Sequence, residues 1–520
     1  MTTRTTRLLL LALTAPGALL AQSTAPRRPA FNVAETTIAD VHAAMRAGTL
    51  TCRELVSAYL QRIAAYDKNG PAINALILVN PAALTVADSL DRRFATGGLV
   101  GPLHCVPVVV KDNFETMDLQ TTAGSLSLQG MVPQQDAFMV RRIREAGAIV
   151  LAKANMAEFA FTPYETVSSI LPGYTKNPYA LDRVTAGSSG GSAAAIAANL
   201  GEVALGTDTG NSIRGPSSHQ ALVGIRSTMG LTSRDGVAPL NLASDIAGPI
   251  ARTVSDAVAV FQVIAGEDAS DTVTARSRGH RVGNYAASLE RDALKGARIG
   301  VLHQAYDRDT ADPEVLRVFN AALDDMRRQG ATIIDPVTVA GLEQRMRTAG
   351  GCNPFKWEIN EWLARQGARA PVHTLAEVIA SRRYHPTIQT RLESAQADTI
   401  PPSRNPGCAS RDAFRAWLRS GVTALMDSLK LDALAYPTWS NPPRLIGDLN
   451  TPHGDNSQLF SPSTGFPAIT VPMGYTQGQL PAGLQLLGRA WAEPTLIGLA
   501  YSYEQATHHR HPPASTVPLR

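Results

Sequence analysis

Residues 187–215 constrain the fold of this 520-residue chain more than any other stretch. They begin with a glycine- and serine-rich loop, and Ser192 stands where the N-cap of a helix is expected, ahead of the small helix-forming residues 193–199. Residues 203–205 predict a short buried strand, and a second polar loop follows over residues 207–214. Small side chains let the helix lie close to neighbouring backbone, so the two serine-bearing loops would be held against each other with little freedom.

Strand-like and helix-like segments alternate along the rest of the chain, which predicts an α/β fold. The predicted strands are residues 75–79, 108–110, 149–152, 297–302, 331–334, 433–437, 468–472 and 481–487. The predicted helices are two within residues 38–64, then 81–94, 137–146, 255–265, 313–329 and 495–506. A mainly helical block over about residues 340–430 is expected to shape a mouth or lid.

The composition fits a soluble globular protein, with 44% apolar and 18% charged residues. The net charge of +4 is small for this length and no long basic run occurs, so we expect no nucleic-acid partner.

The N-terminus has the pattern of a signal peptide. Arg4 and Arg7 precede an apolar run, and Ala21 is the preferred cleavage site, so residues 1–21 are predicted to be removed on export to the periplasm or medium. An uncleaved anchor is the alternative, but the run is interrupted and short for a membrane span. We expect residues 22–35 to be poorly ordered, and no stable membrane insertion after cleavage.

The four cysteines are Cys52, Cys105, Cys352 and Cys408. None forms a CxxC pair, which argues against structural zinc. Export would permit disulfides, and Cys352 and Cys408 lie in the same loop-rich block, so we predict that these two pair.

Ser189 formally occupies the centre of a G-x-S-x-G pattern, which marks the nucleophile of α/β-hydrolases. That chemistry needs a histidine with an acid partner downstream, and His219 follows too closely in the sequence while the C-terminal histidines have no obvious acid. A phosphate-binding loop is a further alternative, but the lysine and spacing of a P-loop are absent.

Lys111, Ser188 and Ser212 form a more specific combination. The two serines lie 24 residues apart in glycine-containing loops, on either side of one helix and one strand. Lys111 ends an apolar strand, where burial would lower its pKa and let it act as a base. Lys153 also follows an apolar strand, and we interpret it as structural.

These motifs resemble the amidase signature family of serine hydrolases. The resemblance covers residues 36–512, taken as a single domain, and is carried by residues 101–113, 186–214, 224–230, 248–256, 465–472, 483–488 and 500–507. It implies a large mixed β-sheet covered by helices on both faces.

The resemblance also implies residue roles. Ser212 is the expected nucleophile, Ser188 a bridging serine on a cis peptide bond, and Lys111 the base. The oxyanion hole maps to the backbone of Thr209, Gly210, Asn211 and Ser212, and the loop is expected to be supported by Ser189, Asp208 and Arg214. Asn211 and Cys105 stand where the family commonly has glycine.

The function implied is that of an exported amidase, which hydrolyses a carboxylic amide through an acyl-enzyme, without a metal or organic cofactor. Its substrate would be a small-molecule or peptide-like amide, and the enzyme a monomer or homodimer. The alternatives are an esterase or carbamate hydrolase, a non-catalytic binding protein and a glutamine-hydrolysing transamidation subunit. We expect the pocket to be lined by Met117, residues 122–125, Met156, Phe159 and the helical block.

Overall fold

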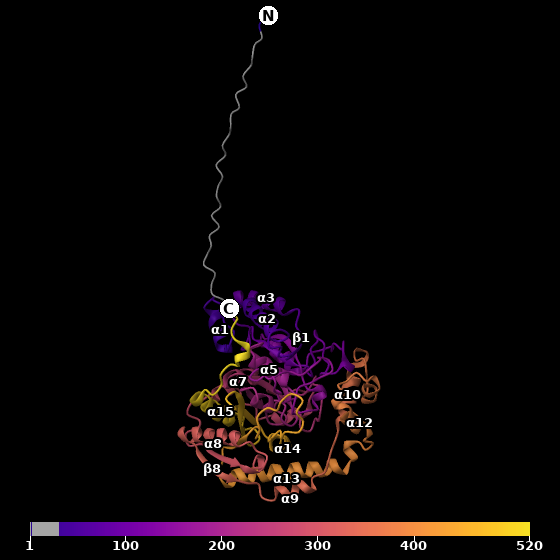
Figure 1. Cartoon of the computed structure of the whole chain (residues 1–520), viewed down its shortest axis with the longest axis vertical. Helices are drawn as coiled ribbons and strands as arrows, with labels where there is room; N and C mark the ends of the chain where they lie inside the picture. Colours follow the sequence, from indigo (N-terminus) through magenta and orange to yellow (C-terminus); the bar gives the residue numbers. More distant parts are fainter. Residues whose placement is uncertain (1, 3–30, 520) are drawn as a thin grey trace. The chain divides into compact units, whose positions relative to one another are not determined.

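One mixed sheet of eleven strands organises the computed structural model, which describes residue 2 and residues 31–519. The strand order is β1-β3-β2-β4-β6-β5-β10-β11-β9-β7-β8. The pairs β2–β3, β2–β4, β7–β8 and β7–β9 are parallel and the other neighbours are antiparallel. Helices cover both faces of the sheet, which confirms the predicted α/β class (Figure 1).

The strands are β1 (Leu76–Val79), β2 (Pro107–Lys111), β3 (Ile149–Ala154), β4 (Val203–Asp208), β5 (Val223–Arg226), β6 (Ile246–Ala251), β7 (Arg298–Leu302), β8 (Thr332–Val337), β9 (Ala433–Pro437), β10 (Ala468–Thr476) and β11 (Leu480–Leu487). Strand β6 was not predicted from the sequence. Gly248 and Pro249 interrupt the apolar pattern of β6, and Gly248 is needed there because an added Cβ would overlap the carbonyl oxygen of Ile225 on β5.

The helices outside the variable block are α1 (Ile38–Arg46), α2 (Cys52–Tyr66), α3 (Ala83–Gly97), α4 (Phe138–Glu145), α5 (Gly190–Ala197), α6 (Arg214–Ser218), α7 (Val254–Ile264), α8 (Pro313–Arg328), α14 (Phe460–Thr464) and α15 (Glu493–Thr507). Thr37 and Thr51 are the N-caps of α1 and α2, and each forms a capping box. From Asn32 onward the described chain forms one compact unit.

The start of α5 differs from the prediction. The helix begins at Gly190, so Ser192 lies inside it and is not its N-cap. The Ser192 hydroxyl instead donates to the carbonyl oxygen of Leu205 on β4, 3.1 Å away. Glycine at 190 and 191 lets the helix approach the surrounding backbone and side chains, because a Cβ at either position would overlap its neighbours.

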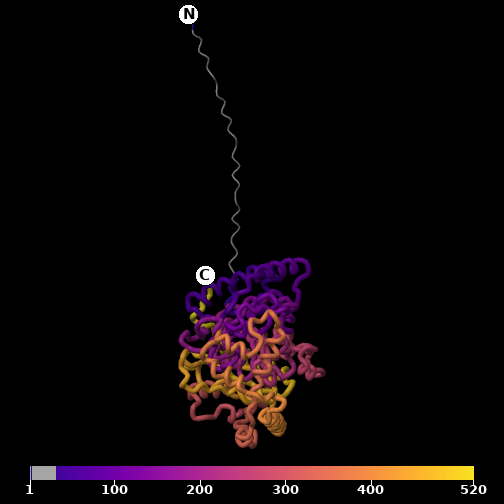
Figure 2. Tube along the Cα trace, turned by 90° about the vertical axis from the view of Figure 1, so that its right-hand side faces the viewer, coloured from indigo at the N-terminus to yellow at the C-terminus, as the bar shows by residue number. Residues whose placement is uncertain are grey.

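The block over residues 340–430 is mainly helical, as predicted. It contains α9 (Leu342–Thr348), α10 (Phe355–Gln366), α11 (Leu375–Ser381), α12 (Gln389–Ala397) and the long α13 (Pro406–Ser428). Helices α9 and α13 run side by side in two perpendicular views (Figures 1 and 2). The predicted disulfide between Cys352 and Cys408 is present and joins the segment before α10 to the first turn of α13.

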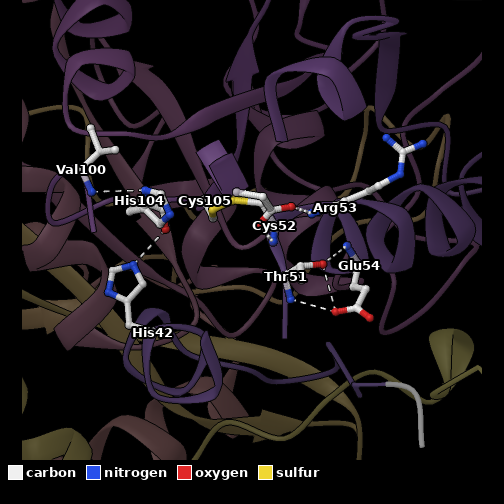
Figure 3. The surroundings of a disulfide bond; sticks show 9 residues. His42, Thr51, Cys52, Arg53, Glu54, Val100, His104 and Cys105 are labelled. Atoms are coloured by element: carbon white, nitrogen blue, oxygen red, sulfur yellow. Dashed lines mark hydrogen bonds between the residues drawn. A yellow bond between two sulfur atoms is a disulfide. The ribbon is translucent and has the colours of Figure 1, made fainter. Parts of the chain in front are cut away.

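A second disulfide, which the sequence did not lead us to expect, joins Cys52 at the start of α2 to Cys105 in the turn before β2 (Figure 3). Cys105 has a backbone φ of 63°, in the left-handed region that favours glycine. His104 lies beside this bond, but both sulfur atoms are committed to the disulfide, so the group does not form a metal site in this state.

The signal-peptide prediction for residues 1–21, and most of the segment 22–35, fall outside the described residues. In the part that is described, no helix is long and apolar enough to cross a membrane.

Candidate active site

Lys111 lies at the end of β2, a strand whose five residues are all buried. Its Nζ is 2.7 Å from Ser188 Oγ and 2.7 Å from Thr207 Oγ1. Burial lowers the pKa of Lys111 to about 7, although the charges of Asp208 and Asp245 act in the opposite direction. A substantial fraction of this amine is therefore neutral, and able to accept a proton, at neutral pH.

Ser188 follows a cis peptide bond with Gly187, the geometry that the family resemblance implied. The serine is fully buried. Its carbonyl oxygen accepts from the N–H of Ala157, which fixes the loop, while its hydroxyl faces the lysine. Lys111 and Ser188 are thus brought into direct contact from positions 77 residues apart.

Ser212 lies in the loop between β4 and α6 and is 5% exposed. It lines a cavity of about 830 Å³. Its hydroxyl lies 3.5 Å from Asn211 Oδ1, at the limit of hydrogen bonding, and in the described residues this is its hydrogen-bond partner. Among the described residues, no hydrogen bond joins Ser212 to Ser188. Ser212 follows β4 in the chain, and Thr207 on β4 contacts Lys111.

The loop around Ser212 presents free backbone donors. Within the part of the chain that the structure describes, the N–H groups of Gly210, Asn211 and Ser212 have no hydrogen-bond acceptor. Asn211, which stands where the family commonly has glycine, does not have a positive backbone φ, and its buried side-chain Nδ2 also has no acceptor among the described residues. Several N–H groups directed by one loop are the arrangement that stabilises an oxyanion.

Asp208 anchors this loop. Its carboxylate accepts from the guanidiniums of Arg214 at 3.0 Å and Arg226 at 3.1 Å, and all three side chains are fully buried. Burial alone would raise the pKa of Asp208, but the two arginines lower it to about 2. Arg214 also donates to the carbonyl oxygen of Gly210 at 2.6 Å, so the ion pair fixes the loop backbone. Arg226, unlike Asp208 and Arg214, was not predicted from the sequence to support this loop.

The side chain of Ser189 is hydrogen-bonded to the backbone of β4. Its hydroxyl donates to the carbonyl oxygen of Thr207 at 3.1 Å and lies 3.3 Å from the Thr207 N–H. His219 is buried, and burial lowers its pKa to about 3. One C-terminal histidine does have an acid partner, since His509 lies 3.2 Å from Asp325, but neither contacts Ser189. The α/β-hydrolase alternative therefore lacks its geometry.

Lys153 is held by three oxygen atoms, including the carbonyl of Phe114 at 2.7 Å, and lies 3.6 Å from Asp112. Unlike Lys111, it has a carboxylate beside it, which agrees with a structural interpretation.

The sequence profile of the Amidase family matches residues 54–497. This chain belongs to that family, the amidase signature enzymes. A probable amidase from Arabidopsis thaliana is 34% identical over 508 residues, covering 93% of this chain and 92% of the relative. A glutamyl-tRNA(Gln) amidotransferase subunit from Myxococcus xanthus is 34% identical over 490 residues, covering 91% of this chain and 98% of the relative.

A solved relative has the same fold. The native peptide amidase from Stenotrophomonas maltophilia superposes with a TM-score of 0.84 at 39% identity, covering 93% of this chain and 99% of that one. The protein is therefore an amidase-type hydrolase that acts on C–N bonds.

The cavity of this amidase is lined differently from the prediction. The helical block contributes to it, as expected, through residues such as Pro354, Ile388 and Arg415. Residues 122–125, Met156 and Phe159 do not line it, and Met117 is 57% exposed and also lies outside it. The side chains of Ala123 and Phe159 instead pack into the hydrophobic cluster that contains Trp362 of the helical block. The wall beside them comes from residues 160–165.

Proposed function

We propose that this protein is an exported amidase that hydrolyses carboxylic amides through an acyl-enzyme on Ser212, with Lys111 as base and Ser188 as proton relay. The observation that carries the proposal is the 2.7 Å contact between a buried lysine, whose pKa burial lowers to about 7, and the hydroxyl of Ser188.

In the first half-reaction, the Ser212 hydroxyl turns from Asn211 Oδ1 toward Ser188. Its Oγ attacks the amide carbonyl carbon and its proton passes through Ser188 to neutral Lys111. The carbonyl oxygen becomes an oxyanion, which the free N–H groups of residues 210–212 stabilise. When the C–N bond breaks, the proton returns through Ser188 to the leaving nitrogen, and ammonia or an amine departs. Water then attacks the ester in the same way, and releases the acid and Ser212.

A cavity of about 830 Å³ favours a medium-sized or peptide-like amide over a very small one. The similarity to a peptide amidase supports the same substrate class. An ester or carbamate would react by the same steps, so a panel of matched amides and esters decides the preference. A role in transamidation would require intracellular partners, which conflicts with the export predicted from residues 1–21.

Covalent labelling by a fluorophosphonate tests the nucleophile. Ser212→Ala is expected to abolish labelling, because the attacking oxygen is lost. Ser189→Ala is the matched control, a second buried serine near β4, and is expected to keep measurable labelling. If Ser189→Ala lost the label and Ser212→Ala retained it, the assignment of the nucleophile would be wrong.

A further inference from the structure

Two arginines of α13 line the same cavity as Ser212 without a full counter-charge. Arg411 and Arg415 lie four residues apart, on one face of the helix. In the described chain, the side chain of Arg411 has neither a hydrogen bond nor an ion pair. A guanidinium that lines a cavity without a partner is available to a ligand.

Arg415 is only partly satisfied. One amine donates to Ser244 Oγ at 2.6 Å, and another lies 3.7 Å from the carboxylate of Asp412. The Asp412 side chain is 73% exposed, so water screens this pair, whereas the Arg415 side chain is 14% exposed. The Nε of Arg415 is buried and has no acceptor among the described residues.

Apart from Asp412, the acids that line the cavity form no ion pair with these arginines among the described residues. Burial raises the pKa of Glu358 to about 7, and its carboxyl accepts from the backbone N–H of Leu242. A third arginine, Arg391, is already engaged, since its guanidinium lies 4.8 Å from the centre of the Phe161 ring and donates to the Phe161 carbonyl oxygen.

We propose that Arg411 and Arg415 form a subsite for a carboxylate of the substrate, so that the enzyme prefers amides that carry a negative charge away from the scissile bond. Arg411 can offer paired N–H donors to a carboxylate and Arg415 adds a second positive charge one turn away, and the bound anion would relieve their mutual repulsion. The inference rests on the proposed function in one respect, that Ser212 is the reaction centre of this cavity.

Binding to Ser212→Ala, measured by calorimetry, separates recognition from turnover. The first ligand pair is acetyl-Glu-Leu-amide and acetyl-Gln-Leu-amide, which differ in charge but hardly in shape. The second pair places the carboxylate on the amine side, as acetyl-Leu-β-alanine against acetyl-Leu-(3-hydroxypropyl)amide. We expect the charged member of one pair to bind about tenfold more tightly. The pair that shows the preference identifies the side of the scissile bond.

Adding Arg411→Gln or Arg415→Gln is expected to reduce that ratio to about one while leaving the affinity for the neutral ligand unchanged. Arg404→Gln is the matched control, because Arg404 is exposed, near the start of α13, and does not line the cavity. This variant should keep the full ratio. Equal affinity in both pairs, no binding of any ligand, or an unchanged ratio in both arginine variants would overturn the subsite.

Hydrolysis by the wild type is a separate readout. If no amide is hydrolysed but the charge preference in binding persists, the proposed hydrolysis is wrong and the subsite stands. If the amides are hydrolysed with no charge preference in binding, the subsite is wrong and the proposed function stands.

Discussion

Lys111 is a buried lysine without a carboxylate within ion-pair distance among the described residues, whereas Lys153 lies beside Asp112. Because the pKa of Lys111 is about 7, the fraction of the amine that is neutral, and so able to accept a proton, falls as the pH drops below 7. We expect kcat/KM to rise about tenfold per pH unit below pH 7 and to level off above it. A rate independent of pH between 5 and 8 would contradict the assignment of Lys111 as the base.

The same residue links stability to pH. Its pKa is about 7 in the fold and has an ordinary value of 10.5 in the unfolded chain, so between these values the unfolded chain binds the extra proton. The free energy of unfolding of the wild type should rise across that window, relative to Lys111→Met, by up to about 1.4 kcal/mol per pH unit. Thermal unfolding of both proteins from pH 6 to 10 measures the difference, and parallel curves would exclude the lowered pKa.

Gly210 shows how closely the loop of Ser212 is packed. A Cβ at this position would overlap Gln458 Oε1 and lie 2.8 Å from its Cδ, and Gln458 is held by Asp455 at 2.7 Å. Gly210→Ala should therefore displace the loop and reduce kcat by at least about tenfold. The double variant Gly210→Ala, Gln458→Ala removes the overlap and should recover much of the loss. Without such recovery, the effect of the substitution does not arise from this contact.

At the scale of the elements, the two disulfides can be compared directly, because they close loops of similar length. They span 56 and 53 residues, so loss of either should lower the free energy of unfolding by a similar amount, roughly 4 kcal/mol in the chain-entropy model. Only Cys352 and Cys408 line the cavity. Replacing this pair by serine should therefore raise KM more than it lowers kcat, whereas replacing Cys52 and Cys105 should leave KM unchanged. Equal KM changes in the two variants would contradict this distinction.

Element identity followed from the sequence where the signal is local and uninterrupted. Strand β6 was missed although all its residues are buried, because Gly248 and Pro249 interrupt its apolar pattern. The apolar run before Lys111 and the helix predicted over residues 313–329 were both recognisable because their signals are local. The network of Asp208 with Arg226 and the cavity wall at residues 160–165 were not, because they depend on which distant segments meet. Phe159 is an example. Its aromatic side chain was expected to line the pocket, but in the fold it packs into the hydrophobic cluster around Trp362.

At the scale of the whole molecule, the compact unit that begins at Asn32 contains the entire sheet and every residue assigned to the site. We therefore expect a protein that begins at Gln22 to unfold at the same temperature as the full chain and to have the same kcat. The predicted export and cleavage would leave Gln22 as the first residue, which N-terminal sequencing of the protein recovered outside the cytoplasm tests. An exported product that retains Met1 would contradict cleavage.

The shared carboxylate of Asp208 has a consequence for how this sequence can diverge. Its two arginine partners come from different elements, α6 and β5, and the three side chains have no access to solvent. Replacing any one of the three residues leaves a buried charge that is poorly compensated, which destabilises the fold. Single substitutions at these positions should therefore be removed by selection. Neutral drift at these positions would require simultaneous changes, and a library that randomises 208, 214 and 226 together should return folded members that preserve the balance of charge across the set. The three positions are therefore expected to be inherited together.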